Sequence, residues 1–356
     1  MHEVAPRAAQ VASILIVRLS AIGDILFATP LLAALRRTFP RARIAWLVQA
    51  EYRELLAAHP DLDLVIPCPI GRWRRDWRHG RRRQVLREVA ALRGQLRRER
   101  FDLALDLQGL LKSGMLTWLS GARQRIGLGS REGSGLLMTR VLAPLPESER
   151  IGSEYLFLAA ALGLTVDDFS MALHYTARDA AAAGRLLDAQ GLRADFIAAC
   201  PFTTRPQKHW IAERWSALAQ RVRAEHGLPL ALLGGPGERA AGDAMAAAAG
   251  GAAVSLAGHT SLPQAAAVIA RSRALVGVDT GLSHAGIALR RPTLLLFGAT
   301  CPYTDTARAD ARVLYHPRAC SPCRRRPSCD GRFDCMRDIG TEEVLAALRQ
   351  LPGLHP

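Results

Sequence analysis

The residues best suited to chemistry stand where an apolar strand gives way to a helix. In "ALVGVDTGLSHAGIAL" (residues 274–289), Asp279, Thr280 and Gly281 follow a strand directly, and His284 falls about one helical turn later. The free amides and the positive dipole end of such a helix bind anions, and the glycine lets a ligand approach the backbone. The segment predicts a nucleotide diphosphate site; the alternative is that Asp279 or Thr280 only caps the helix.

Two other strand ends in the same half carry candidate ligands. "CPFTTRPQKHW" (200–210) offers the hydroxyls of Thr203 and Thr204 and the ammonium of Lys208, one of only two lysines in the chain. A compact ammonium among arginines suits phosphate, although a solvated loop lysine is the simpler alternative. Glu238 follows "LLGGPG", where a carboxylate can bind ribose hydroxyls or stand exposed in a glycine-rich turn.

The first half has a different kind of strand end. Gly23 and Asp24 follow the first apolar strand, and the carboxylate would repel a phosphate at that turn. Its simplest role is to cap a helix beginning at Ile25. A later strand ends in "DLQGLLKSG", which places Asp106 and Lys112, the other lysine, at the same edge of the predicted sheet.

The chain is strongly basic. Lys plus Arg number 47 against 32 Asp plus Glu, a formal net charge of +15. Twelve arginines, Arg72 and Arg74 among them, lie between residues 71 and 100 with Trp73 and Trp77 interleaved. The charge favours anionic partners such as phosphorylated sugars, anionic lipid or nucleic acid. Many of these arginines belong to a solvated helix face, and no nucleic-acid-binding module is recognisable.

Four of the seven cysteines in the chain lie close together in the sequence. Four cysteines form a C-x2-C-x5-C-x5-C cluster: Cys320, Cys323, Cys329 and Cys335. The cluster suits a structural zinc or another small clip, and we expect no catalytic role for it.

The N-terminal apolar run is interrupted by Arg18 and Asp24 before the roughly 18 residues that a membrane span needs. We therefore expect a cytoplasmic protein that touches a membrane surface.

Short apolar runs alternate with helical patterns along the whole chain. This alternation predicts an α/β fold with parallel sheets covered on both faces. The pattern weakens around 125–175 and then restarts, which predicts two Rossmann-like doubly wound domains that face a cleft. We place the domains at 1–178 and 179–340, followed by a C-terminal helix at 341–356.

The order of these motifs resembles a known family. Gly23-Asp24 after the first strand, "DLQGLLKS", "TTRPQKHW" and "VDTGLSHAGIALRRPTLLLFG" are similar to glycosyltransferase family 9, the bacterial ADP-heptose:lipopolysaccharide heptosyltransferases. The resemblance covers about residues 13–350 and is closer to the type that adds the first heptose to Kdo. It implies the two-domain glycosyltransferase B architecture, with the 1–178 domain binding the acceptor, the 179–340 domain binding the donor and the terminal helix returning to the first domain.

The resemblance also implies roles and partners. Asp24 matches the catalytic base of an inverting transfer of heptose from ADP-heptose to the Kdo region of a lipopolysaccharide precursor, Kdo-lipid A, at the inner face of the inner membrane. No cofactor and no nucleic acid is required. The donor ligands would be Thr203, Thr204, Lys208, Glu238, Asp279, Thr280, Gly281 and His284, and the acceptor ligands Gly23, Lys112, Arg72 and Arg74.

Two alternatives stay open. A nucleotide-sugar enzyme of the same architecture with another donor or acceptor, or a 2-epimerase, would share the donor motifs. A basic nucleic-acid-binding protein would bind oligonucleotides with a steep salt dependence and show no preference for ADP.

Overall fold

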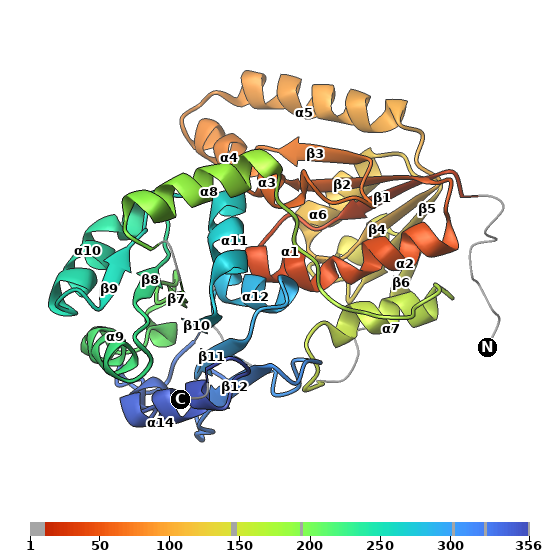
Figure 1. Cartoon of the computed structure of the whole chain (residues 1–356). Helices are drawn as coiled ribbons and strands as arrows, with labels where there is room; N and C mark the ends of the chain where they lie inside the picture. Colours follow the sequence, from red (N-terminus) through yellow and green to blue (C-terminus); the bar gives the residue numbers. More distant parts are fainter. Residues whose placement is uncertain (1–10, 144–147, 193–194, 301–302, 324–325, 355–356) are drawn as a thin grey trace. The chain divides into compact units, whose positions relative to one another are not determined.

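The structure is a computed structural model that describes residues 11–143, 148–192, 195–300, 303–323 and 326–354 (Figure 1). It divides into two compact units. The first comprises residues 1–147 and 152–171, and the second comprises 148–151 and 172–356. Each unit has a sheet of six parallel strands among its described residues, so the α/β fold class expected from the alternating pattern is confirmed. None of the described helices is long and apolar enough to cross a membrane.

The first unit has the strand order β3-β2-β1-β4-β5-β6. Helices α4, α5 and α6 pack on one face of this sheet, where their apolar side chains join those of the strands in one core cluster. Its elements are β1 (Ser13–Val17), α1 (Ile22–Ala28), α2 (Pro30–Thr38), β2 (Arg43–Gln49), η2 (Ala50–Tyr52), α3 (Arg53–Leu56), β3 (Leu64–Cys68), α4 (Ile70–Arg78), α5 (Arg82–Arg98), β4 (Leu103–Asp106), α6 (Leu111–Leu119), β5 (Gln124–Leu128), η3 (Ser134–Leu137), β6 (Arg140–Leu142) and α7 (Ser153–Ala161).

The second unit repeats the plan with the order β12-β11-β10-β7-β8-β9. Helices α9, α10 and α14 contribute to the core on one face, and α8 packs on α11. Its elements are α8 (Ala177–Ala189), β7 (Ile197–Cys200), η4 (Pro206–Lys208), α9 (Ala212–His226), β8 (Leu230–Leu232), η5 (Pro236–Glu238), α10 (Arg239–Ala248), β9 (Ala253–Ser255), α11 (Leu262–Arg271), β10 (Ala274–Val278), α12 (Gly281–Ala288), β11 (Thr293–Phe297), β12 (Ala311–Tyr315), α13 (Asp334–Arg337) and α14 (Thr341–Arg349).

The central strands are buried along their whole length, as β1, β4, β7 and β10 show. Helices cover both faces of such a sheet, so its strands appear in the sequence as continuous apolar runs rather than as alternating ones. Strand β5 and the edge strands β6 and β12 lack such runs, which is why they gave no clear signal in the sequence. Strand β6 has only three residues, and Arg140 and Val141 are partly or largely exposed.

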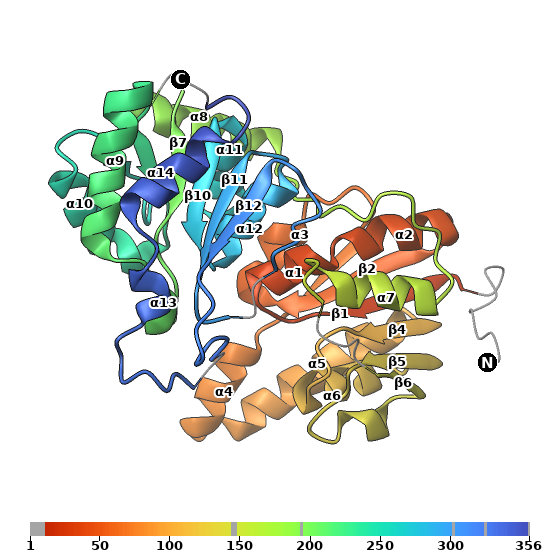
Figure 2. The ribbon, with the colours of Figure 1, turned by 90° about the horizontal axis from the view of Figure 1, so that it is seen from below.

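The C-terminal helix differs from expectation. We expected residues 341–356 to return to the first domain, but α14 packs on α9 within the second unit (Figure 2). Val344, Leu345 and Leu348 are fully buried in the core of that unit. On the helix surface, Arg349 pairs with Glu225 of α9 at 2.5 Å. The apolar stripe of α14 therefore finds its partner on the sheet of its own unit.

Gly109 illustrates a backbone constraint at the end of β4. Its φ is +62°, and an added Cβ would lie 2.6 Å from the carbonyl oxygen of Leu128. Gly80 has a similar φ of +78° but nothing within 4 Å of its Cβ position. Both glycines lie in the first unit, so they differ mainly in the space around them.

We predict that Gly109→Ala lowers the free energy of unfolding by more than Gly80→Ala, which serves as the matched control. Gly80→Ala should cost only the left-handed backbone term of about 1–2 kcal/mol. Gly109→Ala adds a clash with main-chain atoms that have no room to move, and we expect at least about 1 kcal/mol more. Chemical denaturation followed by circular dichroism measures both values, and equal losses would contradict the prediction.

Candidate functional site

Several predicted donor ligands gather at one edge of the second unit. Strands β7 and β10 are neighbours, with Cys200 opposite Gly277, so their carboxyl ends open on the same edge. Asp279 and Thr280 follow β10, and Thr280 is the N-cap residue of α12. Lys208 closes the short helix η4 after β7. The sheet thus brings together residues that lie about 70 positions apart in the chain.

Asp279 is the centre of a polar network at this edge. Its Oδ2 lies 2.6 Å from Lys208 Nζ, and its Oδ1 lies 3.4 Å from His284 Nε2. Thr300, which follows β11, donates its hydroxyl hydrogen to the same carboxylate. Burial works against the charge of Asp279, but His284 and Lys208 outweigh it and hold the pKa of the carboxyl below its usual value. Asp279 is therefore an anion that fixes the cation beside it.

This pairing changes the interpretation of Lys208. The sequence suggested Lys208 and Asp279 as two separate donor ligands, whereas the structure makes them a pair with both side chains 14% exposed. Lys208 Nζ also lies 3.4 Å from the backbone carbonyl oxygen of Asp279. An ammonium has three hydrogen-bond donors, so two held by Asp279 leave one for a ligand. Thr300 was missed by the sequence analysis, although its place after a strand end was a usable signal.

The start of α12 adds donors to the same edge. Thr280 makes no side-chain cap, and within the described residues the amides of Gly281 and Leu282 have no backbone hydrogen bond. Free amides at a helix start carry partial positive charge and bind anions. Together with the remaining donor of Lys208, they form a candidate phosphate site whose positive groups lie on rigid elements.

The positions of the other predicted donor ligands give weaker support for a donor-binding role. Thr203 and Thr204 lie in the loop between β7 and η4, with Thr203 half-buried and Thr204 exposed. The Glu238 carboxylate accepts a hydrogen bond from the backbone amide of Gly235 and so closes its own loop at η5. That contact matches the simpler interpretation of a glycine-rich turn, and the ribose contact of Glu238 stays a prediction.

The first unit has its own candidate site at the carboxyl end of β1. The structure starts helix α1 at Ile22 rather than at the expected Ile25, so Asp24 lies in its first turn and not at its N-cap. Asp24 Oδ2 accepts a hydrogen bond from the Ala21 amide at 3.0 Å and lies 2.7 Å from an Arg18 guanidinium nitrogen. Gly23, predicted on the acceptor side, is the residue before it in the same turn.

Arg18 is the residue that the sequence analysis overlooked at this end of β1. Its side chain is 11% exposed, whereas that of Asp24 is 40% exposed. One guanidinium nitrogen donates to the backbone carbonyl of Leu107 at 2.6 Å. Burial opposes its charge, but nearby Tyr155 and Asp24 raise the pKa of Arg18 above its usual value, so it stays a cation. The sequence signal that could have identified Arg18 was an arginine directly after a buried strand.

The two oxygens of Asp24 therefore differ. Oδ2 is held by Arg18 and the Ala21 amide, while Oδ1 makes no hydrogen bond within the described part of the chain. A carboxylate with one oxygen anchored, on a side chain that is 40% exposed, can accept a proton from a hydroxyl group placed at this edge.

The loop after β4 lies beside this site because Val17 of β1 is opposite Asp106 of β4. Asp106 is buried and caps its own loop, since its carboxylate accepts from the Gln108 and Gly109 amides and the Ser113 hydroxyl. Burial raises its pKa. Lys112 lies in the first turn of α6, at the same edge of the sheet.

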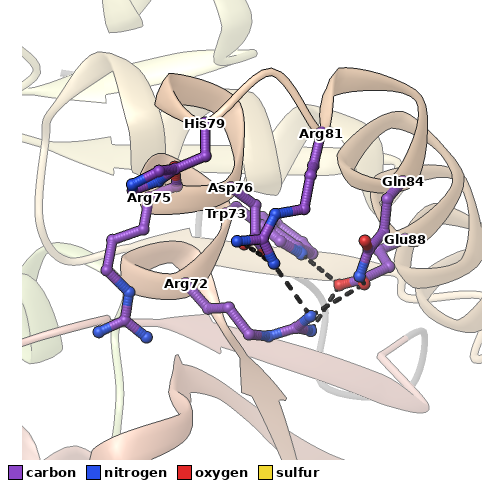
Figure 3. A network of polar contacts seen from close by, with 8 residues as sticks. All are labelled: Arg72, Trp73, Arg75, Asp76, His79, Arg81, Gln84 and Glu88. Atoms are coloured by element: carbon purple, nitrogen blue, oxygen red, sulfur yellow. Dashed lines mark hydrogen bonds and ion pairs between the residues drawn. The ribbon is translucent and has the colours of Figure 1, made fainter.

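The predicted acceptor arginines belong to the α4–α5 surface. Figure 3 shows the Arg72 guanidinium directed at Glu88, with nitrogen–oxygen distances of 3.0 and 2.5 Å, and Trp73 Nε1 donating to the same carboxylate at 2.7 Å. The hydrogen bond from Arg72, with those from Trp73 and Gln84, lowers the pKa of Glu88 to about 2. Arg72 is thus partly committed within its own unit, whereas Arg74 is exposed.

The cysteine cluster forms no disulfide among the described residues. Cys329 and Cys335 are buried, and Cys320 and Cys323 are half-buried. Burial, together with the neighbouring thiols, raises the pKa of Cys335. No group of three or more His, Cys, Asp or Glu side chains in the described ranges is arranged to hold a metal ion, and the expected clip stays a prediction.

Known proteins share both the sequence and the fold. The pattern of glycosyltransferase family 9 (heptosyltransferase) matches residues 89–332. Lipopolysaccharide heptosyltransferase 1 of Pseudomonas aeruginosa is 33% identical over 327 residues, covering 88% of this chain and 86% of that protein. The protein of the same name from Escherichia coli K12 is 30% identical over 298 residues, covering 81% and 88%. The solved structure of E. coli heptosyltransferase WaaC with ADP has a TM-score of 0.75 at 25% identity, covering 95% of this chain and 99% of that one.

Two doubly wound units with candidate sites at their carboxyl-end edges define a glycosyltransferase of the B architecture. The chain belongs to glycosyltransferase family 9, the heptosyltransferases. The resemblance stated from the motifs is confirmed, including its likeness to the first-heptose type.

We predict that Asp279→Asn lowers the free energy of unfolding by roughly 3 kcal/mol at neutral pH, because it leaves the buried Lys208 ammonium without its counter-charge. The folded pKa of Asp279 is depressed, so its stabilising effect is present above the unfolded pKa near 3.9 and is lost as pH falls through the lower folded value. The penalty should stay constant from pH 7 to about pH 4 and shrink only below that.

Urea denaturation at several pH values measures this penalty. The matched control is Asp195→Asn, which removes the exposed partner of Arg273 and should have little effect. A penalty no larger than that of the control would show that the Lys208–Asp279 pair does not stabilise the fold.

Proposed function

We propose that this protein transfers heptose from ADP-heptose to the Kdo region of the lipopolysaccharide inner core, with inversion at the transferred carbon and Asp24 as general base. The observation that carries the proposal is the Asp24 carboxylate at the end of β1, with Oδ2 anchored by Arg18 and a side chain that is 40% exposed. Membership of family 9 and relatives named lipopolysaccharide heptosyltransferase 1 support the donor and the acceptor.

The donor half of the proposal rests on the second unit. A related solved structure is that of E. coli heptosyltransferase WaaC with ADP. In this chain, the α12 amides and Lys208 would bind the diphosphate and stabilise the negative charge that develops on ADP as it leaves. Thr203, Thr204 and His284 would complete the donor site, with Glu238 on the ribose. These positive groups support transfer without a cofactor.

The acceptor half rests on the first unit. As the C–O bond to the heptose forms, the acceptor hydroxyl loses its proton to Asp24 Oδ1, and the bond to the ADP phosphate oxygen breaks. A single displacement of this kind inverts the configuration at the carbon. Arg18 keeps the base in place by holding its other oxygen.

The acceptor is an anionic lipid, which suits the basic first unit. Lys112 and the exposed Arg74 would contact its carboxylates and phosphates, and Arg72 would do so from its pair with Glu88. We accordingly propose that the protein works in the cytoplasm at the inner face of the inner membrane, where anionic lipids attract arginine-rich surfaces.

Incubation of the protein with ADP-heptose and heptoseless Kdo-lipid A tests the proposal directly. ADP release that depends on the acceptor, with a heptose-sized mass added to the acceptor, is the expected result. Conversion of the free donor without acceptor would indicate a 2-epimerase instead. Turnover with a different nucleotide sugar would indicate another enzyme of the same architecture.

We predict that Asp24→Asn lowers kcat by roughly 10²-fold or more while the affinity for ADP stays unchanged, because a base acts on the acceptor and not on the nucleotide. The asparagine carbonyl oxygen can still accept from Arg18, which preserves the local structure. Steady-state kinetics and calorimetric titration with ADP measure the two quantities. The matched control is Asp167→Asn, which breaks the exposed pair with Arg37 and should leave both unchanged. Joint loss of ADP binding and turnover would refute the role of Asp24 as base.

We predict that Lys208→Ala weakens ADP binding about tenfold, because it removes a hydrogen-bond donor and a charge from the diphosphate. Calorimetry in buffer with EDTA measures this affinity without help from divalent metals. The control is Lys112→Ala, the chain's only other lysine, which should leave ADP affinity unchanged. Lys208→Gln, which keeps a donor for Asp279, should weaken binding as well. Unchanged affinity in both Lys208 variants would contradict the phosphate role.

A further inference from the structure

The exposed large apolar side chains of this protein are unevenly distributed. Among the described residues, all seven of them lie in the first unit, and three lie on the single helix α6. They are Trp77, Leu86, Leu111, Met115, Trp118, Leu136 and Val141. Single exposed apolar residues need no explanation, but a group on one helix marks a surface that interacts with something apolar.

The most exposed side chains of helix α6 are apolar. Leu111, Met115 and Trp118 are 43%, 50% and 50% exposed, and their spacing of four and three residues places them on one side of the helix. The opposite side, which includes Ser113 and Leu116, is buried in the unit. A surface helix normally presents charged or polar residues to water. In α6 the three exposed residues are apolar, and the single charged residue, Lys112, is only partly exposed.

The short helix η3 extends this surface. It packs on α6, where a Cβ added at Gly114 would lie 2.9 Å from the Ser134 side chain. Leu136 of η3 is 92% exposed. We call Leu111, Met115, Trp118 and Leu136 together the α6 apolar face.

Cationic side chains lie along one flank of the α6 apolar face. Helix α5 contacts α6, lies on the same side of the sheet (Figure 2), and carries one acidic residue, Glu88, which is paired with Arg72. The Arg97 side chain lies 3.5 Å from the Cβ position of Gly121, just past the end of α6. The exposed arginines of α5 are Arg82, Arg83, Arg87, Arg93, Arg97 and Arg98.

We propose that the α6 apolar face inserts shallowly into an anionic lipid bilayer while the α5 arginines contact the lipid head groups. Apolar side chains beside arginines are the combination that binds helices to anionic membrane surfaces, and a tryptophan such as Trp118 suits the interface between head groups and acyl chains. A second copy of this chain fits less well, because it would bring two arginine-rich flanks together.

The position of α6 connects this surface with the proposed acceptor site. The helix begins directly after β4, at the carboxyl-end edge that β4 shares with β1 and therefore with Asp24. The proposal rests on the proposed function only in this respect: a lipid-anchored acceptor would present its sugar at the edge from which the α6 apolar face starts. The test of the membrane proposal needs no transfer reaction.

Co-sedimentation of the full chain with vesicles tests the proposal. We expect binding to vesicles of phosphatidylcholine with 30% phosphatidylglycerol, chosen as the anionic probe, and roughly tenfold weaker binding to pure phosphatidylcholine. The double variant Met115→Glu/Trp118→Glu should reduce binding to the anionic vesicles at least tenfold. The control, Gln220→Glu/Ala224→Glu on exposed positions of α9, adds the same charge and should bind as the unmodified protein does.

Further measurements keep the proposal falsifiable. A blue shift of the tryptophan emission on adding anionic vesicles, lost in Trp118→Phe while sedimentation persists, would support insertion of this face. Equal binding by the α6 double variant and the α9 control would overturn the proposal. So would a concentration-dependent dimer in light scattering that the α6 substitutions abolish, if the protein does not bind vesicles.

The failure of this proposal is distinguishable from failure of the proposed function. The α6 double variant should keep its kcat on a delipidated, water-soluble Kdo acceptor and lose activity only on acceptor embedded in vesicles. If no acceptor is glycosylated by any form of the protein, the proposed function fails while the vesicle result still stands. Equal loss on both acceptors would mean that the α6 substitutions damage the site, and would count against the membrane role.

Discussion

A parallel sheet covered by helices on both faces leaves polar side chains almost no place except the ends of its strands. In both units the central strands are buried throughout, and a polar group left unpaired among them costs free energy. The carboxyl-end edge is where backbone amides become free and where charged residues meet water. The two candidate sites, around Asp24 and around Asp279, both lie at such an edge.

Both sites pair a carboxylate with a cation, but the group that is left available to a ligand differs. In the first unit the Arg18 cation, whose side chain is 11% exposed, holds a carboxylate whose side chain is 40% exposed. In the second unit the Asp279 carboxylate, which is 14% exposed, holds the cation Lys208 and leaves it one donor to offer. One edge therefore presents a carboxylate, and the other presents positive charge. This difference suits the proposed sugar transfer, in which one reactant loses a proton and the other leaves as an anion.

The buried parts of this fold were largely predictable from the sequence, and the pairings at the strand ends were not. Long apolar runs such as β1 and β10 show their burial directly, and strand ends followed by glycine indicate the site edge. Edge strands such as β6 depend on tertiary contacts that leave little trace in three residues. The pairing of Lys208 with Asp279 joins residues 71 positions apart, and only the strand order brings them together. The expectation that Asp24 caps a helix beginning at Ile25 placed the start of α1 three residues too late, since the helix begins at Ile22.

The contacts of Lys208 bear on why this position is a lysine in a chain rich in arginine. Arginine greatly outnumbers lysine, with two lysines in 356 residues. At position 208 the cation lies between the carboxylate and the backbone carbonyl of Asp279 with little exposure, and a planar guanidinium fork would need a wider space. The contacts of Asp279 therefore favour lysine at position 208, even in a chain that uses arginine at nearly every other cationic position.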